Sequence, residues 1–365
     1  VKKVAIEDLQ KRHFSNYNSS LVKFVGYIHD IDSSGYHCKV ENDEKSNDFV
    51  DMDLLSVSSL DTLSQWSYES IYKKKKESET SSFISVFACS HFKVNLNQIC
   101  EFIGFIQPSE NDKNVVYCLY IKPLSSVLQY NSSDNPQKIL FKTKEVFTKL
   151  FNGDETAAYL FLFYLQSRIR CWDDHYMPGK FTLNFYETTE AEFFAEIVEN
   201  LSELCRTMQL NLDSLNTSMD FLPSKYVSKD DKMNSSLLQN PQNTRIVIDE
   251  TKMQPGQLNE TGTANILALK KLAASQQLDI NFSIYSKSFN VSYPILILSK
   301  SKSLLDCDLS YKIPEKIVKS TLSELSPLDV DELRAILNSN LPDMDFSDDL
   351  KEVLFFRLLN FSAYS

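Results

Sequence analysis

The run Thr244-Arg-Ile-Val-Ile-Asp-Glu250 combines consecutive apolar positions with two carboxylates at its end. A continuous apolar run predicts a strand buried on both faces, as in a parallel sheet covered by helices. Such sheets bind ligands beyond the carboxyl ends of their strands, and Asp249 and Glu250 are expected there. The pattern resembles a Walker B site, in which the Asp holds magnesium and the Glu polarises the attacking water.

The segments around this run continue an alternation of strands and helices. Further strands are predicted at residues 180–185 and 293–298, and helices at 154–170, 193–204 and 264–274. The helix at 154–170 is apolar on nearly all sides, so we expect it to be buried. Strands separated by helices indicate a parallel α/β domain, which we place at residues 137–310.

A phosphate cradle is missing from this sequence. The cradle has the pattern G-x-x-x-x-G-K-[ST], whose glycines let backbone N–H groups wrap the phosphates and whose lysine neutralises their charge. The position where it should fall reads Tyr186-Glu-Thr-Thr-Glu-Ala-Glu192, with no glycine and three carboxylates that would repel a triphosphate. We therefore interpret residues 137–310 as a degenerate AAA+-like domain that lacks a P-loop and binds no nucleotide cofactor.

Asp249 and Glu250 allow two interpretations. In the structural one, they cap the following turn or bond to neighbouring loops, as the remnant of a lost site. In the functional one, they grip a basic residue of a partner subunit. The sequence favours the structural interpretation, and we name no catalytic residue.

Patterns typical of metal sites and of other enzymes are missing too. The 5 histidines form no H-x-x-x-H pair, and no G-x-S-x-G elbow occurs. His29 and His37 flank a predicted turn near residues 32–35, where no carboxylate or thiolate lies at a spacing that suits a metal. The 7 cysteines are widely spaced and are expected to be reduced thiols.

Residues 1–130 are predicted to form an OB-like β-barrel. Alternating strands are expected at 21–28, 36–40, 83–87 and 100–106. Gly26 and Gly104 each interrupt a strand, where a missing side chain permits the bend or bulge that closes a barrel. Residues from about 41 to 82 are rich in Asp, Ser, Lys and Glu, so we expect a long, partly mobile insertion there. A turn-rich stretch at 129–136 marks the boundary to the α/β domain.

The last region, residues 311–365, is predicted to be helical. Its final segment is Leu350-Lys-Glu-Val-Leu-Phe-Phe-Arg-Leu-Leu359. A helix there would pack as a lid or offer a surface to a partner.

The overall composition argues against nucleic acid and membranes as partners. The formal net charge of −11 would repel phosphate backbones. No apolar run approaches the roughly 18 residues needed to cross a bilayer, and no secretory leader follows Val1. We expect a soluble globular protein. The basic block Lys73–Lys76 is either a nuclear-import signal or a solvated loop.

Several segments resemble the MCM-binding protein family, the eukaryotic partners of the minichromosome maintenance (MCM) helicase. The strongest resemblance lies in Ser236-Leu-Leu-Gln-Asn-Pro241, in Ile246-Val-Ile-Asp-Glu-Thr251 and in Gly256-Gln-Leu258. Supporting segments in the same order are 21–24, 28–30, 153–160, 179–184 and 221–226. The resemblance covers most of residues 20–310 and is specific over about 150–300.

This resemblance implies a non-enzymatic protein that binds MCM helicase subunits by imitating one of them. It would assist the assembly, storage or unloading of the helicase in DNA replication, without a cofactor and without direct contact to nucleic acid. A nuclear location is expected, with the cytoplasm as an additional one.

Two other functions stay open. A residual nucleotide-binding ATPase or sensor is suggested by Asp249 and Glu250, and would bind an ATP analogue at micromolar concentration. A single-stranded nucleic-acid binder is suggested by the aromatic strands of the barrel, and would bind oligonucleotides in a salt-sensitive manner. For Trp66 and Trp172, core packing is favoured over base stacking.

Overall fold

The structure is a computed structural model. It describes residues 2–3, Ile6 and most of 21–338, with gaps at 40–48, 74–81, 109–113, 131–135, 170–171, 173–176, 218–220, 222–223, 226–232, 235 and 283–284. The predicted helix at 350–359, most of the basic block at 73–76, and two of the histidines (His13 and His175) lie outside the described residues.

The N-terminal strands form one antiparallel-rich sheet that closes on itself. Its order is β1 (Lys2–Lys3), β2 (Leu21–Lys39), β3 (Phe49–Ser58), β4 (Phe83–Cys89), β6 (Asn114–Leu124), β5 (Ile99–Pro108), and β5 pairs back with β2. Alternate residues fill the interior: Ile84, Val86 and Ala88 of β4 are buried, whereas the residues between them are half-buried. We call the ring β2–β6 the closed sheet.

Two glycines allow the strands of the closed sheet to approach each other. A Cβ atom at Gly104 would lie 2.4 Å from the carbonyl oxygen of Tyr117, and the register of β5 against β6 shifts between Ile103 and Gly104. A Cβ atom at Gly26 would lie 2.6 Å from the side chain of Val57. The bulge predicted at Gly104 is therefore confirmed, while Gly26 serves close packing against β3.

The expected polar insertion at 41–82 is largely wrong. It contains the strand β3 and the helix α2 (Gln65–Tyr72), and Leu55 and Val57 are fully buried in the closed sheet. A strand with one solvated face carries polar residues at alternate positions, so the average polarity of the segment hid the strand. The turn expected at 32–35 is also wrong, because β2 continues through it with a register shift between Asp32 and Tyr36.

The C-terminal half contains a parallel sheet with the order β15 (Leu309–Lys312), β7 (Thr182–Tyr186), β14 (Ile295–Ser299), β11 (Arg245–Asp249), β8 (Cys205–Gln209). The three predicted apolar strands are thus confirmed, and they lie at the centre of the sheet. In β11, Val247 faces one hydrophobic core while Ile246 and Ile248 face the other.

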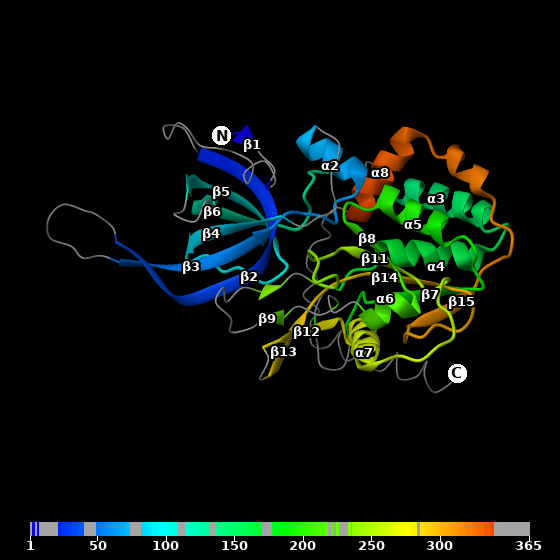
Figure 1. The fold of residues 1–365 in the computed structure, drawn as a ribbon. Helices are drawn as coiled ribbons and strands as arrows, with labels where there is room; N and C mark the ends of the chain where they lie inside the picture. Colours follow the sequence, from blue (N-terminus) through cyan, green and yellow to red (C-terminus); the bar gives the residue numbers. More distant parts are fainter. Residues whose placement is uncertain are drawn as a thin grey trace, which may run out of the picture.

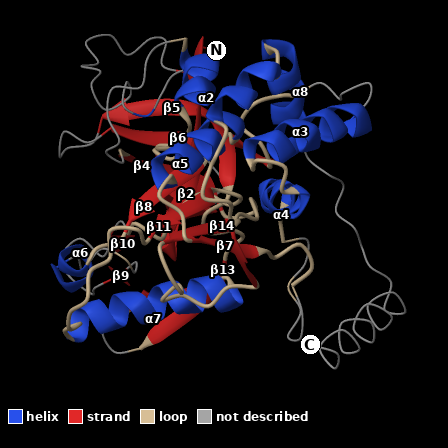
Figure 2. Ribbon diagram, turned by 90° about the vertical axis from the view of Figure 1, so that its right-hand side faces the viewer, coloured by secondary structure: helices blue, strands red, loops and turns tan. Residues whose placement is uncertain are grey.

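Helices cover both faces of the parallel sheet (Figure 2). The first core holds residues of α3 (Pro136–Leu150), α4 (Glu155–Gln166), α5 (Ala191–Leu201) and α8 (Pro327–Asn338). The second core holds residues of α6 (Leu212–Thr217) and α7 (Glu260–Ser275). The part of the predicted helical tail that is described, a 3-10 turn at Lys319–Glu324 and α8, therefore belongs to the first core.

Helix α4 begins as predicted, since Asp154 caps it by accepting a hydrogen bond from the Ala157 N–H at 3.0 Å. Its complete burial is wrong. Tyr159 is 45% exposed and Phe163 57% exposed, so one side of this apolar helix faces outward.

A smaller sheet that was not predicted lies next to the parallel sheet. It has the order β10 (Met233–Asn234), β9 (Ser224–Lys225), β12 (Gln277–Asn281), β13 (Ser286–Asn290), and β12 and β13 form an antiparallel hairpin. Figure 1 shows the closed sheet on one side of the molecule and the parallel sheet on the other, with this hairpin near the boundary. No helix in the described residues is long and apolar enough to cross a membrane.

Candidate functional site

Asp249 and Glu250 lie at the carboxyl end of β11, as predicted, and both are buried (4% and 6% exposed). One carboxylate oxygen of Asp249 accepts hydrogen bonds from the backbone N–H and the hydroxyl of Thr251, at 2.8 and 2.6 Å. Its second oxygen accepts from Gln209 at 3.2 Å. The side chain of Asp249 thus holds the turn after β11 and the neighbouring strand β8.

Glu250 is engaged by the loop after β14. Its carboxylate accepts from the Ser303 hydroxyl at 3.1 Å and from the Leu304 N–H at 3.2 Å. Burial raises the pKa of Glu250, and these hydrogen bonds oppose that rise. Both acids of the predicted Walker B-like pair are therefore bonded to neighbouring parts of the same chain, as in the structural interpretation.

The loop after β7 stands where a phosphate cradle would be. Only four residues separate β7 from α5, and the Thr188 N–H donates to the Ser299 carbonyl at 3.2 Å. The Thr188 hydroxyl accepts from the Glu190 N–H at 3.1 Å. The backbone of Glu187 has a φ of 59°, a value that residues other than glycine rarely adopt. The loop is short and is held by one hydrogen bond within it and one to the end of β14.

Three glutamates follow β7, and each forms an ion pair with a lysine from another part of the α/β region. The pairs are Glu187–Lys312 at 2.6 Å, Glu190–Lys319 at 2.6 Å and Glu192–Lys252 at 3.5 Å. Such exposed pairs contribute little stability individually. Their consequence is electrostatic, because carboxylates of the chain itself occupy the N-terminus of α5, where a P-loop protein would hold phosphate.

The described residues contain no group of three or more His, Cys, Asp and Glu side chains that could hold a metal ion. His29 is buried in the closed sheet with its ring edge-on to Phe83 at a centroid distance of 4.9 Å. That the chain binds neither a metal nor a nucleotide stays a prediction from the sequence.

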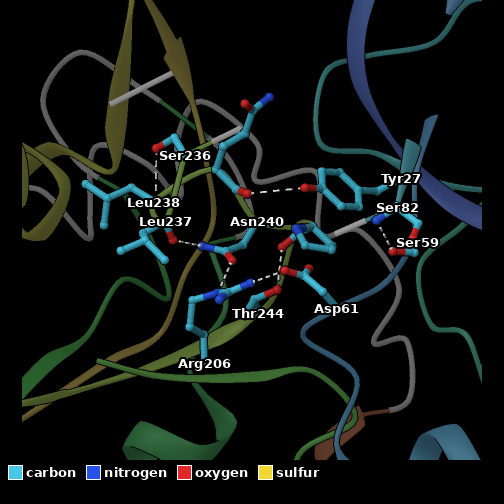
Figure 3. Close-up of polar contacts among 12 residues, drawn as sticks. Tyr27, Ser59, Asp61, Ser82, Arg206, Ser236, Leu237, Leu238, Asn240 and Thr244 are labelled. Carbon is cyan, nitrogen blue, oxygen red and sulfur yellow. Dashed lines mark hydrogen bonds and ion pairs between the residues drawn. The ribbon is translucent and has the colours of Figure 1, made fainter. Parts of the chain in front are cut away.

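Apart from the site around Asp249 and Glu250, a cluster of polar side chains lies where the closed sheet meets the α/β region. We call this cluster the junction (Figure 3). Its centre is the segment 236–244 that precedes β11. Asn240 accepts from the Arg206 guanidinium at 2.6 Å and donates to the Leu237 carbonyl at 3.0 Å. Arg206 also forms an ion pair with Asp61, a residue between β3 and α2, at 2.5 Å. Arg206 on β8 therefore links this segment to the closed-sheet side.

Tyr293 connects the same segment to the loop 95–98 of the closed sheet. Its hydroxyl accepts from the Asn97 side chain at 3.0 Å and donates to the Asn240 carbonyl at 2.5 Å. Gln239 donates to the His29 carbonyl at 2.8 Å, and the Tyr27 hydroxyl donates to the Gln239 carbonyl at 3.4 Å. The segment 236–241, one of those with the strongest family resemblance, thus lies between the two parts and is bonded to both, and all its residues except Leu237 are buried.

Helix α2 adds a second connection between the two parts. The Trp66 indole N–H donates to the Glu199 carbonyl of α5 at 3.1 Å, and the guanidinium of Arg334 on α8 lies 4.1 Å from the Trp66 ring centroid. Core packing was predicted for both tryptophans. Trp66 is half-buried in this contact, whereas Trp172 is 41% exposed, so the prediction for Trp172 is wrong.

Arg245, at the amino end of β11, is the largest fully buried side chain among the described residues. Its guanidinium donates to the Leu165 carbonyl at 2.6 Å, the Leu337 carbonyl at 3.0 Å and the Asn338 side chain at 3.0 Å. These acceptors lie at the carboxyl ends of α4 and α8, where the helix dipole favours a cation. Burial lowers the pKa of Arg245. Arg245 thereby fastens two helices to the sheet.

The buried imidazole of His29 makes stability depend on pH. Burial lowers its pKa from 6.5 to about 4, and the nearby carboxylates of Asp30 and Asp61 only partly oppose this. As pH falls below about 6.5, the unfolded chain takes up a proton that the folded chain refuses, so stability decreases until about pH 4.

We expect His29→Phe to remove this dependence. Between pH 7 and pH 5, the free energy of unfolding should fall about 2 kcal/mol less in His29→Phe than in the unmodified chain. Urea unfolding at both pH values measures this difference. The control is His91→Phe, since His91 is exposed. Identical pH dependence in the unmodified chain and His29→Phe would show that His29 does not resist protonation.

The junction residues were not predicted from the sequence. Arg206, Tyr293 and Asn240 are separated by tens of residues and meet only through the parallel pairing of β8, β11 and β14. The available signal was the polar pair Gln239-Asn240 shortly before an apolar strand. Such a pair indicates buried polar contacts only once the residues that surround it in the fold are known.

Comparison with known proteins gives a consistent picture. A family model described as "Mini-chromosome maintenance replisome factor" matches residues 119–340. The chain is 29% identical over 217 residues to the mini-chromosome maintenance complex-binding protein of Homo sapiens. This match covers 58% of this chain and 32% of the relative. It is 31% identical to that of Gallus gallus (47% of this chain, 28% of the relative) and 28% identical to that of Dictyostelium discoideum (49% and 26%). The match thus spans about a third or less of each relative.

Proposed function

The chain belongs to the mini-chromosome maintenance replisome factor family, and from this premise we propose that it is a non-enzymatic binding partner of the MCM helicase. It imitates a helicase subunit and assists the assembly, storage or unloading of the complex during DNA replication. The family model covers both the parallel sheet and part of the closed sheet, so the proposal concerns the described core of the chain. The printed name of the relatives, a complex-binding protein, supports it.

The imitation rests on two likenesses of fold. We propose that the parallel α/β part is AAA+-like, because one strand, β14, separates the strand before the cradle position from the strand that carries Asp249. We propose that the closed sheet is OB-like, because five strands form a single ring with a register shift at Gly104. MCM helicase subunits combine parts of the same two kinds, as the family resemblance implies.

The observation that carries the proposal is that the carboxyl ends of the parallel strands offer no open site for a nucleotide among the described residues. A site for ATP needs free backbone N–H groups, a lysine and exposed carboxylates for magnesium. Here Thr188, Asp249 and Glu250 are bonded to other parts of the chain, and three carboxylates surround the start of α5. A subunit-like protein without nucleotide is able to occupy an interface, yet it cannot complete an ATP-dependent ring built from repeated heterologous contacts.

Capture of purified MCM subunits by the immobilised chain tests this proposal. Retention of subunits at micromolar concentration without ATP is expected. The same chain should show no saturable binding of a labelled ATP analogue in that concentration range. Saturable analogue binding would favour the residual ATPase or sensor instead, and salt-sensitive oligonucleotide binding would favour the single-strand binder.

The proposal also predicts the behaviour of Asp249→Ala. The variant leaves the Thr251 N–H, the Thr251 hydroxyl and Gln209 without their acceptor, so the free energy of unfolding should drop by about 2 kcal/mol. Capture of MCM subunits should stay unchanged, because the carboxylate is directed inward. Glu250→Gln, which retains an acceptor oxygen, is the milder companion. A loss of capture in either variant while the fold is intact would show instead that the pair grips a basic residue of a partner.

We further propose a nuclear location, as expected for a helicase partner, with the cytoplasm as an additional one. Fluorescence microscopy of the tagged chain checks this, and replacement of the lysines at 73–76 tests the basic block as an import signal.

A further inference from the structure

A groove of about 620 Å³ lies between the closed sheet and the β12–β13 hairpin. One wall comes from Ile31 of β2 and the loop 94–96, and the other from the hairpin. Trp172 lines it from the segment after α4. Figure 1 shows the hairpin on the side of the α/β region that faces the closed sheet. The groove is thus at the same boundary as the junction but outside its hydrogen-bonded centre.

One face of the hairpin lines this groove, and the other carries Asp279 and Ser288, which bond to Lys271 of α7. Ile280 and Phe282 of the β12 side, with Lys287 and Phe289 of β13, line the groove at alternate positions, and Asn290 lines it at the end of β13. Ser288, between the last two, instead bonds to Asp279 at 2.5 Å and to Lys271 at 2.9 Å. The period of two therefore directs apolar and cationic side chains into the groove.

Lys287 is the cation of this groove, and it is exposed without an ion-pair partner among the described residues. The other charged side chain, Asp30, is 7% exposed and already accepts from the Ile31 N–H at 2.9 Å. The groove thus offers aromatic and aliphatic surface with an exposed cation, Lys287, and a buried carboxylate, Asp30, that is already hydrogen-bonded within the chain.

The outer edge of the hairpin has no neighbouring strand among the described residues. β13 is the last strand of its sheet in the described residues. The Phe282 N–H bonds to the Tyr285 carbonyl at 2.9 Å, and alternation then pairs Ile280 with Lys287 by hydrogen bonds. Ser286 and Ser288 consequently direct their backbone N–H and C=O groups away from β12, as an edge that can accept another strand.

We propose that this groove binds an extended segment of a partner protein, which adds to the edge of β13 and places an apolar side chain against Trp172 and Phe289 and a carboxylate near Lys287. The inference rests on the proposed function, and its partner is a segment of an MCM helicase subunit. The exposed lysine and the adjoining strand edge favour a peptide over a compact small molecule, which would not use the edge.

The test uses the unmodified chain, intact MCM subunits, and overlapping labelled peptides that cover those subunits. Lys287→Glu and Trp172→Ala should each weaken binding of intact subunits and of the bound peptide about tenfold. Lys300→Glu is the matched charge control. Lys300 is also an exposed lysine, but it follows the carboxyl end of β14, whereas the hairpin precedes the amino end of that strand. The peptides that bind should carry an acidic residue next to an apolar one.

Amide hydrogen exchange provides a readout that does not depend on the variants. Exchange across Ser286–Asn290 should slow when the peptide or the intact subunit is bound, because the open edge becomes paired. Unchanged exchange there, with unchanged affinity in Lys287→Glu and Trp172→Ala, would overturn the groove proposal while leaving helicase binding in place. Failure of the unmodified chain to bind any MCM subunit would overturn both.

Discussion

Arg245→Ala should lower the free energy of unfolding by about 4 kcal/mol, which is large for a single substitution. The guanidinium supplies hydrogen bonds to the Leu165 and Leu337 carbonyls and to Asn338, and all three acceptors are buried. Removing it leaves them unsatisfied and opens a cavity between α4, α8 and β11. Urea unfolding followed by circular dichroism measures the change.

Two comparison variants make this result specific. Arg245→Lys keeps the charge but reaches fewer acceptors, and should cost less than the alanine variant. Lys300→Ala alters an exposed cation and should leave stability unchanged. A cost below about 1 kcal/mol for Arg245→Ala would mean that water replaces the guanidinium, and that Arg245 does not fasten the helices.

Arg206→Ala should cost about 3 kcal/mol, because it removes the cation from Asp61, whose side chain is 7% exposed, and the donor from Asn240. Unlike Arg245, Arg206 joins the α/β region to the closed-sheet side. We therefore expect its loss to loosen the junction before the parallel sheet unfolds. Limited proteolysis within residues 59–64 should accelerate along with the decrease in stability.

A double-mutant cycle separates the ion pair from the rest of the junction. Asp61→Asn alone should be destabilising, and Arg206→Ala combined with Asp61→Asn should cost about 2 kcal/mol less than the sum of the single variants. The control pair is Lys149 and Glu324, which form an exposed ion pair at 2.6 Å and should show almost no coupling. Additive costs at Arg206 and Asp61 would contradict a coupled junction.

The parallel sheet was predictable from local sequence. The runs in β7, β11 and β14 are buried at nearly every position, so their apolar character has no polar alternation to obscure it. Helix α7 was recognisable by its apolar period, and its Asn259 cap accepts from the Gly262 N–H at 2.8 Å. Because the central strands are buried on both faces, their apolar sequence alone predicts the secondary structure that is observed.

The elements that were missed have one exposed face. β3 alternates buried Leu55 and Val57 with half-buried Ser56, and the acids Asp51 and Asp53 in its first half gave the segment a polar average. β13 exposes Lys287 and Ser288 and pairs with β12 alone among the described strands, so its sequence contains no apolar run that would predict it. For such strands the pairing partner supplies the burial, and the partner is known only from the fold.

The candidate site was predictable in position but not in its contacts. The sequence places Asp249 and Glu250 at a strand end, and the structure confirms that position. Their partners Gln209 and Ser303 come from neighbouring strands and loops, which local patterns cannot identify. The absence of a cradle was readable from composition, whereas the lysines that pair with Glu187 and Glu190 required the fold.

The most direct measurement is the mass of the complex formed by this chain with purified MCM subunits, using size-exclusion chromatography with light scattering, with and without ATP. Our account predicts a stoichiometric complex of the same mass in both conditions. The reason is that the residues at the carboxyl end of the parallel sheet, where ATP would bind, are bonded to other parts of this chain. No complex at micromolar concentration, or a complex that forms only with ATP bound to this chain, would contradict it.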